Sequence, residues 1–193
     1  EESVKFPYPT YIRPACFPGP EYERQMIAFG MTDGAKNMVD NCQVSGFGRT
    51  FQPGTSFDDF LSLKTDKNNE ETGVTFDQDK LVKASIGMEL DPKSCQQMFW
   101  DSPIKGAGRM VVTDSELCAL GREVEVMVGA DGQTKTLRQD TCNGDSGGPF
   151  TCLDGRTMND PFDKNNIPRR VQVALVSWGM KCGENLPGVY ERV

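Results

Sequence analysis

The sequence predicts an all-β fold, either a sandwich or a barrel. Three observations lead to this prediction: short segments rich in alternating and β-branched residues, frequent Gly, Pro and Asn turns between them, and almost no helical periodicity. A chain of 193 residues suits one domain or two small ones and is long enough to bury a core. It contains neither an internal repeat nor a low-complexity tract.

The N-terminal half contains an extended segment and two predicted strands. Residues 4–20 hold five prolines among aromatic and β-branched residues, which suits an extended connecting strap and disfavours a helix. Residues 42–48 alternate and then stop at glycines, as a short strand does. Residues 66–79 are polar enough for a solvated loop, whereas residues 81–88 alternate loosely and predict a second strand.

The one predicted helix is short. Asp91 is placed to cap it and Pro92 to begin its first turn, so that it runs through Cys95 and Met98. Strand and turn patterns then return. The elements predicted there are a strand at 124–128, a turn at 131–132, a polar loop at 159–170 and a strand at 171–176, which has the clearest strand pattern in the chain.

Composition argues against several classes of function. Lys and Arg number 21 and Asp and Glu number 28, so the formal net charge is −7. This balance argues against a general affinity for nucleic acid or anionic membrane, because phosphate binding needs clustered cations. No apolar run approaches the roughly 18 residues of a membrane span. We therefore expect neither a nucleic-acid partner nor a membrane partner.

Seven cysteines and the absence of histidine are more informative than the charge. Without histidine the chain lacks the commonest general base and the commonest metal ligand. The cysteines stand singly, with no C-x-x-C pair, so we expect no metal site, no cofactor and no redox dithiol. Disulfides are the better interpretation, and they imply a secreted, extracellular protein. An odd count leaves one cysteine that is unpaired or pairs outside this chain.

Residues 142–149 form a motif, Cys-Asn-Gly-Asp-Ser-Gly-Gly-Pro. Glycines on both sides of Ser146 allow a sharp turn and leave room for a substrate beside its Oγ. They also allow the backbone N–H groups of Gly144 and Ser146 to point into one small space, where they could hold an oxyanion. Asp145 is unusual for an exposed turn and suits a buried carboxylate that needs a cation. The simpler interpretation of this segment alone, a solvated Gly-rich turn, stays open.

Residues 144–149 resemble the nucleophile motif of the chymotrypsin/trypsin family of serine endopeptidases. Four further segments resemble parts of that family: the interdomain strap at 11–18, the first strand of the second barrel at 44–48, the substrate-binding strand at 176–179 and the pocket wall at 182–193. The resemblance implies an all-β, trypsin-like double β-barrel. In it, residues 1–30 form the strap and the end of the first barrel, and residues 31–193 form the second barrel.

The resemblance implies a role for each matched residue. Ser146 would be the acylated nucleophile, and the Gly144 and Ser146 amides the oxyanion hole. Asp140 would lie at the base of the specificity pocket and select Lys or Arg, with a solvated turn carboxylate as the alternative. Asp145 would pair with the amino terminus that activation of a zymogen creates. The other substrate-binding positions are the backbone of Ser177, Trp178 and Gly179 and the pocket-wall glycines Gly179 and Gly188.

The resemblance also implies how the cysteines pair, a choice that spacing alone leaves open. Its three disulfides are Cys42 with Cys152, Cys95 with Cys118, and Cys142 with Cys182. Cys16 is then left over. It matches the strap position that bridges to a cysteine in the propeptide or light chain, outside residues 1–193. The alternative for Cys16 is a free buried thiol.

The triad histidine and aspartate of the family would precede these residues, so we expect the chain alone to be inactive. Combined with a His-bearing N-terminal portion, linked through Cys16, it would cleave polypeptides after Arg or Lys as a trypsin-like serine endopeptidase. The alternative is a catalytically inactive homologue that serves as a binding or assembly module. The long segments 121–138 and 153–170 favour narrow specificity, with neutral drift of loop length as the alternative.

Overall fold

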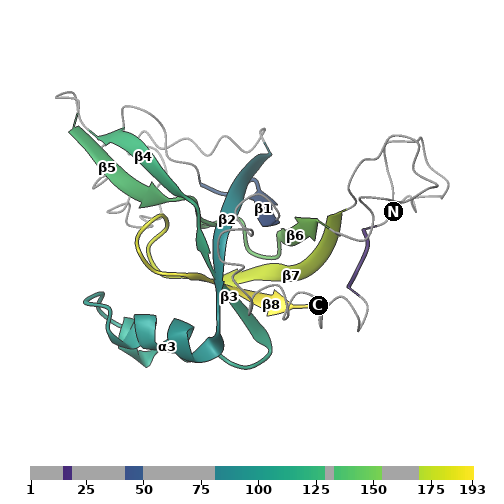
Figure 1. The fold of residues 1–193 in the computed structure, drawn as a ribbon, viewed down its shortest axis with the longest axis horizontal. Helices are drawn as coiled ribbons and strands as arrows, with labels where there is room; N and C mark the ends of the chain where they lie inside the picture. The colour runs from purple at the N-terminus through teal and green to yellow at the C-terminus, as the bar shows by residue number, and fades with distance from the viewer. Residues whose placement is uncertain (1–14, 19–41, 50–80, 129–132, 154–169) are drawn as a thin grey trace, which may run out of the picture.

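The computed structural model describes residues 15–18, 42–49, 81–128, 133–153 and 170–193. Figure 1 shows that strands are the main regular structure in this part of the chain, with one short helix at the lower edge of the view. The elements are β1 (Cys42–Gly46), β2 (Val82–Leu90), α3 (Pro92–Trp100), the 3₁₀ turn η2 (Ala107–Arg109), β3 (Glu116–Gly121), β4 (Glu123–Val128), β5 (Gln133–Arg138), β6 (Pro149–Leu153), β7 (Arg170–Trp178) and β8 (Gly188–Arg192).

Six strands close into a barrel in the order β1-β2-β3-β8-β7-β6, and every pair in it is antiparallel. The two remaining strands, β4 and β5, pair only with each other and project from the barrel as a ribbon (Figure 1). Closure joins β1 to β6, so the barrel has no free sheet edge around its circumference. The prediction of an all-β fold is confirmed.

The barrel interior is filled by alternate residues of its strands. In β1, Cys42 and Val44 are buried and the residues between and after them are less so, as the period of two requires. Phe150 of β6 and Tyr190 of β8 meet edge to face inside, with ring centroids 4.8 Å apart. Strand β3 is buried along its whole length because its two faces contact two cores, the barrel interior and the cluster beneath α3.

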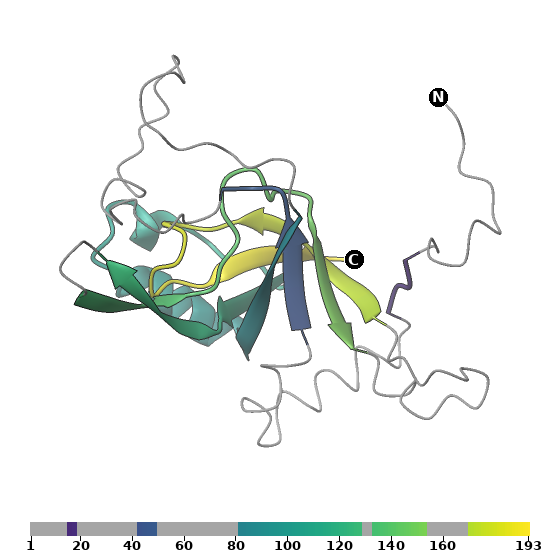
Figure 2. The same cartoon turned by 90° about the horizontal axis from the view of Figure 1, so that it is seen from above.

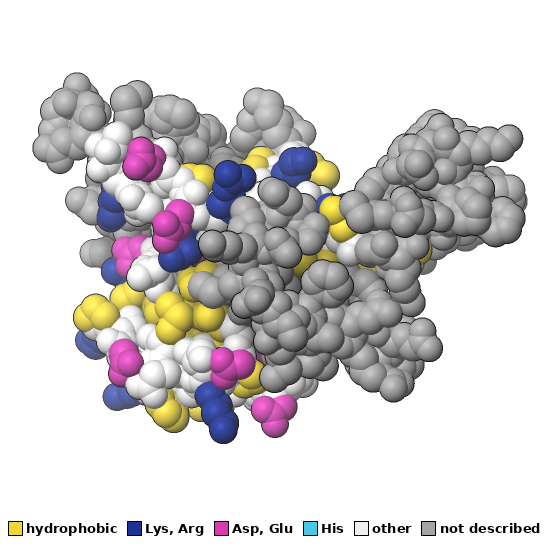
Figure 3. Space-filling model, in the orientation of Figure 1, with side chains coloured by type: hydrophobic (Ala, Val, Ile, Leu, Met, Phe, Trp, Pro, Cys, Tyr) yellow, Lys and Arg dark blue, Asp and Glu magenta, His cyan; other side chains and the backbone are white. Residues whose placement is uncertain are grey.

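Helix α3 begins where the sequence predicts. The Oδ1 atom of Asp91 accepts hydrogen bonds from the backbone N–H groups of Lys93 at 3.0 Å and Ser94 at 3.1 Å, so Asp91 caps the helix. Cys95 and Phe99 lie one turn apart on its buried face and anchor it to the barrel. The cluster beneath α3 also contains hydrophobic residues of the barrel wall, and apolar side chains lie between helix and ribbon on the face shown in Figure 3.

The strands at 42–46, 82–90, 123–128 and 170–178 agree with the predicted ones within a few residues. Four strands had no prediction: β3, β5, β6 and β8. Strand β3 lacks a period of two because both faces are buried, and β6 and β8 begin at a proline and a glycine that locally favour turns. The segment 121–138 is therefore mostly a β-ribbon. The predicted loop at 66–79, the turn at 131–132 and the domain boundary near residue 30 lie outside the described residues, as does the predicted loop at 159–170 except for Arg170, which begins β7.

The predicted strap is described only at residues 15–18. Cys16 forms an isolated parallel bridge with Val171, and its carbonyl accepts a hydrogen bond of 2.9 Å from the Gln172 N–H. Figure 2 shows this short segment beside the start of β7. The Cys16 side chain is exposed, so the buried thiol considered above is wrong, and it has no disulfide partner among the described residues.

Three disulfides are present, Cys42–Cys152, Cys95–Cys118 and Cys142–Cys182, and these are the pairs that the family resemblance implies. The first crosses from β1 to β6 at the closure of the barrel, where the two cysteines are register partners. Of the helices in the described part of the chain, none is long and apolar enough to cross a membrane.

We expect removal of the barrel-closing disulfide to cost more stability than removal of the helix disulfide. Cys42 and Cys152 are 110 residues apart and Cys95 and Cys118 are 23 apart. The chain-entropy relation gives about 5 kcal/mol for the longer loop and about 3.5 kcal/mol for the shorter one. Urea unfolding of the two double Cys→Ala variants measures the difference. Equal losses, or the reverse order, would contradict this prediction.

Candidate active site

The loop that carries Ser146 is held from both sides. On one side, Gly147 N–H donates to the Val176 carbonyl at 2.8 Å, and Val176 N–H donates to the Gly148 carbonyl at 2.9 Å. On the other, Arg49 N–H donates to the Asn143 carbonyl at 3.0 Å. These bonds fasten the loop to β7 and to the segment after β1, so a rigid scaffold determines its backbone conformation.

The turn itself depends on glycine. Gly144 has φ of 99° and Gly147 has φ of 80°, values in the left-handed region that side chains rarely adopt. Inside the turn, Asp145 N–H donates to the Cys142 carbonyl at 3.0 Å and Gly148 N–H to the Asp145 carbonyl at 2.8 Å. Ser146 therefore sits at the tip of a closed turn with its side chain exposed. This arrangement leaves the hydroxyl accessible to a substrate.

The Asp145 carboxylate points away from the tip and into the protein. Its Oδ1 accepts a hydrogen bond of 2.8 Å from Gly48 N–H, and its Oδ2 accepts one of 2.9 Å from Cys142 N–H. A Cβ on Gly48 would lie 2.5 Å from Asp145 Cγ, and a Cβ on Gly46 would also collide with this carboxylate. The glycines after β1 thus make room for the carboxylate, which the sequence motif alone did not indicate.

The Asp140 carboxylate is also fixed by two backbone hydrogen bonds. Its Oδ1 accepts a hydrogen bond of 2.8 Å from Thr141 N–H, and its Oδ2 accepts one of 3.0 Å from Gly183 N–H. Burial raises the pKa of Asp140 to about 6, against the two hydrogen bonds that lower it, and the negative charge of Asp145 raises it further. The bond from Gly183, which is 43 residues away, and the partial burial disfavour the alternative of a fully solvated turn carboxylate.

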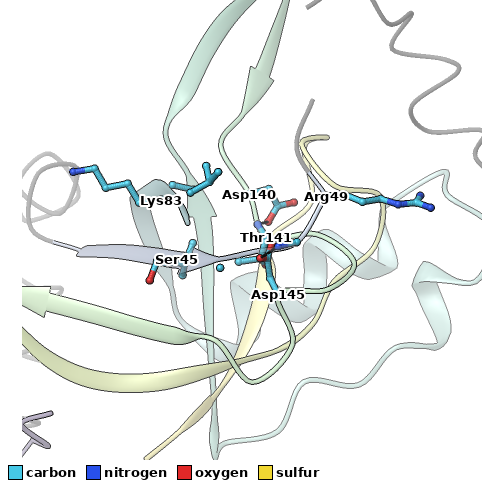
Figure 4. Close-up of a pocket in the computed structure, with 11 residues that line it drawn as sticks. Ser45, Arg49, Lys83, Asp140, Thr141 and Asp145 are labelled. Carbon is cyan, nitrogen blue, oxygen red and sulfur yellow. Dashed lines mark hydrogen bonds between the residues drawn. The ribbon is translucent and has the colours of Figure 1, made fainter. Parts of the chain in front are cut away.

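Asp140 and Asp145 line one small cavity of about 40 Å³ between β1, β2 and the Ser146 loop. Figure 4 shows their side chains close together at its centre, whereas the side chains of Arg49 and Lys83 point away from them. Two carboxylates facing one cavity create a negative potential that favours a cation.

The pair of glycines predicted to form the pocket wall lies side by side at the ends of β7 and β8. A Cβ on Gly179 would lie 3.8 Å from Gly188 Cα. A Cβ on Gly188 would lie 2.6 Å from the hydroxyl of Tyr190, whose side chain is buried and cannot move aside. Burial and then the charge of Asp140 raise the pKa of the Tyr190 hydroxyl, so it stays protonated beside the carboxylate.

The predicted substrate-binding strand is the end of β7. Ser177 and Gly179 are exposed, and Trp178 between them is partly buried against Phe99, with ring centroids 5.2 Å apart. The disulfide Cys142–Cys182 ties this wall to the Ser146 loop. The structure thus brings the residues predicted for nucleophile, pocket and strand onto neighbouring segments of one rigid barrel.

Sequence reasoning missed several residues that support this arrangement. Arg138 donates from Nε to Asn185 Oδ1 at 3.0 Å and from Nη2 to Glu123 Oε1 at 2.6 Å, and its backbone N–H donates to the Gly183 carbonyl at 3.0 Å. It therefore links the β4–β5 ribbon to the loop whose Gly183 N–H binds Asp140. These partners are up to 47 residues apart in the chain, so no local pattern could reveal them.

Comparison with known protein families and with curated proteins identifies the family of this chain. The Trypsin family model matches residues 90–193, which is more than half of the chain. The chain belongs to the trypsin family. It is 30% identical over 189 residues, 96% of its length, to "Serine protease 41" of Homo sapiens, and 33% identical over 144 residues, 73% of its length, to "Complement C1s subcomponent" of Sus scrofa.

Two further matches are shorter. The trypsin-family chain is 36% identical over 83 residues to "Tissue-type plasminogen activator" of Homo sapiens and 39% identical over 82 residues to "Glucanase inhibitor protein 3" of Phytophthora infestans; each match covers 42% of it. It spans 40% of the length of serine protease 41 and 17% of complement C1s. It is therefore related to part of each of these proteins.

The raised pKa of Asp140 predicts a stability difference that grows with pH. Its ordinary pKa is 3.8 and its folded pKa is about 6, so the stability linked to the protonated form is complete below 3.8 and is lost as pH rises through 6. Asp140→Asn carries no such charge. Between pH 4 and pH 7.5, we expect the free energy of unfolding of Asp140→Asn, relative to that of the wild type, to rise by up to about 3 kcal/mol.

Urea unfolding at the two pH values measures this gain, with Asp114→Asn, which removes an exposed carboxylate, as the control. A difference between Asp140→Asn and the wild type that does not change with pH would contradict the prediction.

Proposed function

We propose that this chain carries the nucleophile, the oxyanion hole and the specificity pocket of a serine endopeptidase. The observation that supports it best is the position of Ser146, exposed at the tip of a glycine turn that is hydrogen-bonded to the barrel on both sides. Ser146 Oγ attacks the substrate carbonyl, and the N–H groups of Gly144 and Ser146 stabilise the oxyanion. The acyl-enzyme forms as the amine leaves with a proton, and water then releases the acid.

The cleaved bond follows Arg or Lys in this proposal. Asp140 carries a partly buried carboxylate, fixed by two backbone N–H groups, at the junction of the Ser146 loop and the pocket wall. A cationic side chain of the substrate would offset the cost of burying this charge. Gly179 and Gly188 support the assignment because neighbouring positions without side chains leave space for a long basic group.

Asp145 is proposed to bind the amino terminus that activation cleavage creates. Its two oxygens each accept one backbone hydrogen bond, which leaves further lone pairs for an ammonium group. The small cavity beside it, with its two carboxylates, suits such a cation. The protein is then made as a zymogen, and the new terminus fixes the conformation of the Ser146 loop.

The catalytic imidazole comes from another part of the protein, because none of the 193 residues is histidine. We propose that this His-bearing portion is linked to the chain through Cys16, whose side chain is exposed. Three disulfides and the family membership support a secreted, extracellular protease with polypeptide substrates. The ribbon at 123–138 favours narrow specificity because it stands next to the loop that contacts Asp140.

A catalytically silent binding module is the second candidate. The absence of histidine favours it, and one relative bears the name of a glucanase inhibitor. The intact turn around Ser146 argues against it, because a scaffold has no need for an exposed serine hydroxyl next to two partly buried carboxylates.

A fluorophosphonate probe on the full-length, processed protein separates the two candidates. It reacts with a serine only where a base and an oxyanion hole activate the hydroxyl. We expect Ser146 to be labelled, with Ser94 on α3 as the internal control that stays unlabelled. A processed protein in which Ser146 does not react would favour the silent module.

A further inference from the structure

Glu116, the first residue of β3, has an unusual environment. Among the residues that the structure describes it is the one buried charged residue, with 9% of its surface exposed. Its Oε1 accepts a hydrogen bond of 2.8 Å from the indole Nε1–H of Trp178. Its Oε2 accepts one of 2.7 Å from Thr113 N–H and one of 3.0 Å from Thr113 Oγ. Each carboxylate oxygen of Glu116 therefore accepts at least one hydrogen bond.

The Glu116 carboxylate stays ionised. Burial acts to raise its pKa, but the hydrogen bonds from the Thr113 N–H, the Trp178 indole and the Thr113 hydroxyl together outweigh burial and lower it. An ionised acceptor binds an N–H donor more strongly than a neutral one does. The bond to Trp178 is therefore a strong constraint on the indole at neutral pH.

Strand pairing alone does not explain the carboxylate of Glu116. Strand pairing puts Glu116 directly opposite Glu191 of β8, and like charges in opposite positions destabilise a sheet. Apolar residues would fill a buried site at the top of β3 at lower cost. A function outside sheet formation accounts better for its presence.

The constrained residue lies in the proposed substrate-binding strand. Trp178 ends β7, pairs with Val189 and directly precedes the exposed Gly179. Its ring packs at a tilt of 43° on Phe99, and its Nε1 is held by Glu116. The ring contact and the hydrogen bond together constrain the orientation of the indole more than either would alone.

We propose that Glu116 is a positioning residue that orients Trp178 for the part of a peptide substrate preceding the cleaved bond. This inference rests on the proposed function of β7 as the substrate-binding strand. An extended peptide lying along Ser177 to Gly179 passes the indole, whereas a single arginine residue occupies only the pocket. Loss of the Glu116 bond thus weakens binding of extended peptides and leaves single-residue substrates unaffected.

The test uses the full-length protein with Trp100→Phe, which leaves Trp178 as the sole tryptophan of this chain. In this background we compare Glu116→Ala and Glu116→Gln with Asp114→Asn, a control that removes an exposed acid outside the site. Hydrogen exchange of the Trp178 indole N–H, followed by NMR after selective labelling of tryptophan, reports the bond itself. We expect exchange about tenfold faster in Glu116→Ala, a smaller increase in Glu116→Gln and no change in Asp114→Asn.

Kinetics then test the positioning role. For a tetrapeptide ending in arginine, we expect KM of Glu116→Ala to rise about tenfold with kcat nearly unchanged. A single-residue arginine ester should be cleaved by Glu116→Ala as by the wild type, and Asp114→Asn should behave as the wild type with both substrates. If Glu116→Ala does not fold, Glu116→Gln shows the same difference between substrates at a smaller size: KM rises for the tetrapeptide and stays unchanged for the ester.

Unchanged indole exchange, or KM values that shift equally for both substrates, would overturn the inference. A wild-type protein that cleaves neither substrate would contradict the proposed function instead. The dissociation constant of the tetrapeptide, measured by isothermal titration calorimetry, then tests the role of Glu116. Weaker binding in Glu116→Ala than in Asp114→Asn supports the positioning role, and equal binding refutes it.

Discussion

Replacing Ser146 by alanine is expected to lower kcat/KM of the full-length, processed protein at least ~10⁴-fold toward a peptide ester or amide. The hydroxyl is the atom that forms and breaks the acyl bond, so no neighbouring group replaces it. Gly144 and Gly147 hold the turn at positive φ, and neither conformation depends on the serine side chain. The variant should therefore fold and bind substrate normally.

Ser94→Ala is the matched control. Ser94 is an exposed serine on α3, outside the loop that carries Ser146, and its replacement should leave kcat/KM within about twofold of the wild type. Near-UV circular dichroism checks that both variants fold. Retention of activity in Ser146→Ala would show that another residue is the nucleophile.

Asp140→Ser is expected to reduce cleavage after Arg or Lys by ~10²- to 10⁴-fold. Removing one member of a desolvated charge pair costs about 3–5 kcal/mol, because the substrate cation is then buried without a partner. The backbone donors Thr141 N–H and Gly183 N–H also lose their acceptor. The loss should fall on basic substrates only, whereas the fluorophosphonate reaction of Ser146 should persist.

Asp114→Ser provides the control, since Asp114 is an exposed carboxylate on the turn before β3. It removes the same charge from the chain and should leave cleavage after Arg unchanged. Unchanged cleavage by Asp140→Ser would show that Asp140 is not the specificity residue. A loss of both cleavage and labelling would indicate instead that the variant disturbs the whole Ser146 loop.

Local patterns predicted much of the fold. Asp91 and Pro92 mark the start of α3, because a cap and a first-turn proline act within four residues. Strands β1 and β7 were predictable because one face of each packs on the barrel interior, and burial on one face produces a period of two. Strand β3 was not, because burial on both faces erases that period.

The residues of the candidate site also fall into two groups: those that a local sequence pattern predicted and those that it did not. The turn around Ser146 is a local structure, and its glycines at fixed offsets made it visible in the motif. Glu116 and Arg138 gave no such signal, because their partners come from segments up to 62 and 47 residues away. Whether a carboxylate is exposed or buried and bonded depends on those distant segments, so Glu116 could not be distinguished from any other acid.

The sequence by itself determined the chemistry that this protein can carry: a serine in a glycine turn, a carboxylate six residues before it, cysteines for disulfides and no imidazole. These properties depend on residue type and short spacing. Only the tertiary structure decided that barrel closure brings Gly48 N–H to Asp145, Gly183 N–H to Asp140 and Glu116 to Trp178. The physical reason is that hydrogen bonds act over about 3 Å in space, whatever the distance along the chain.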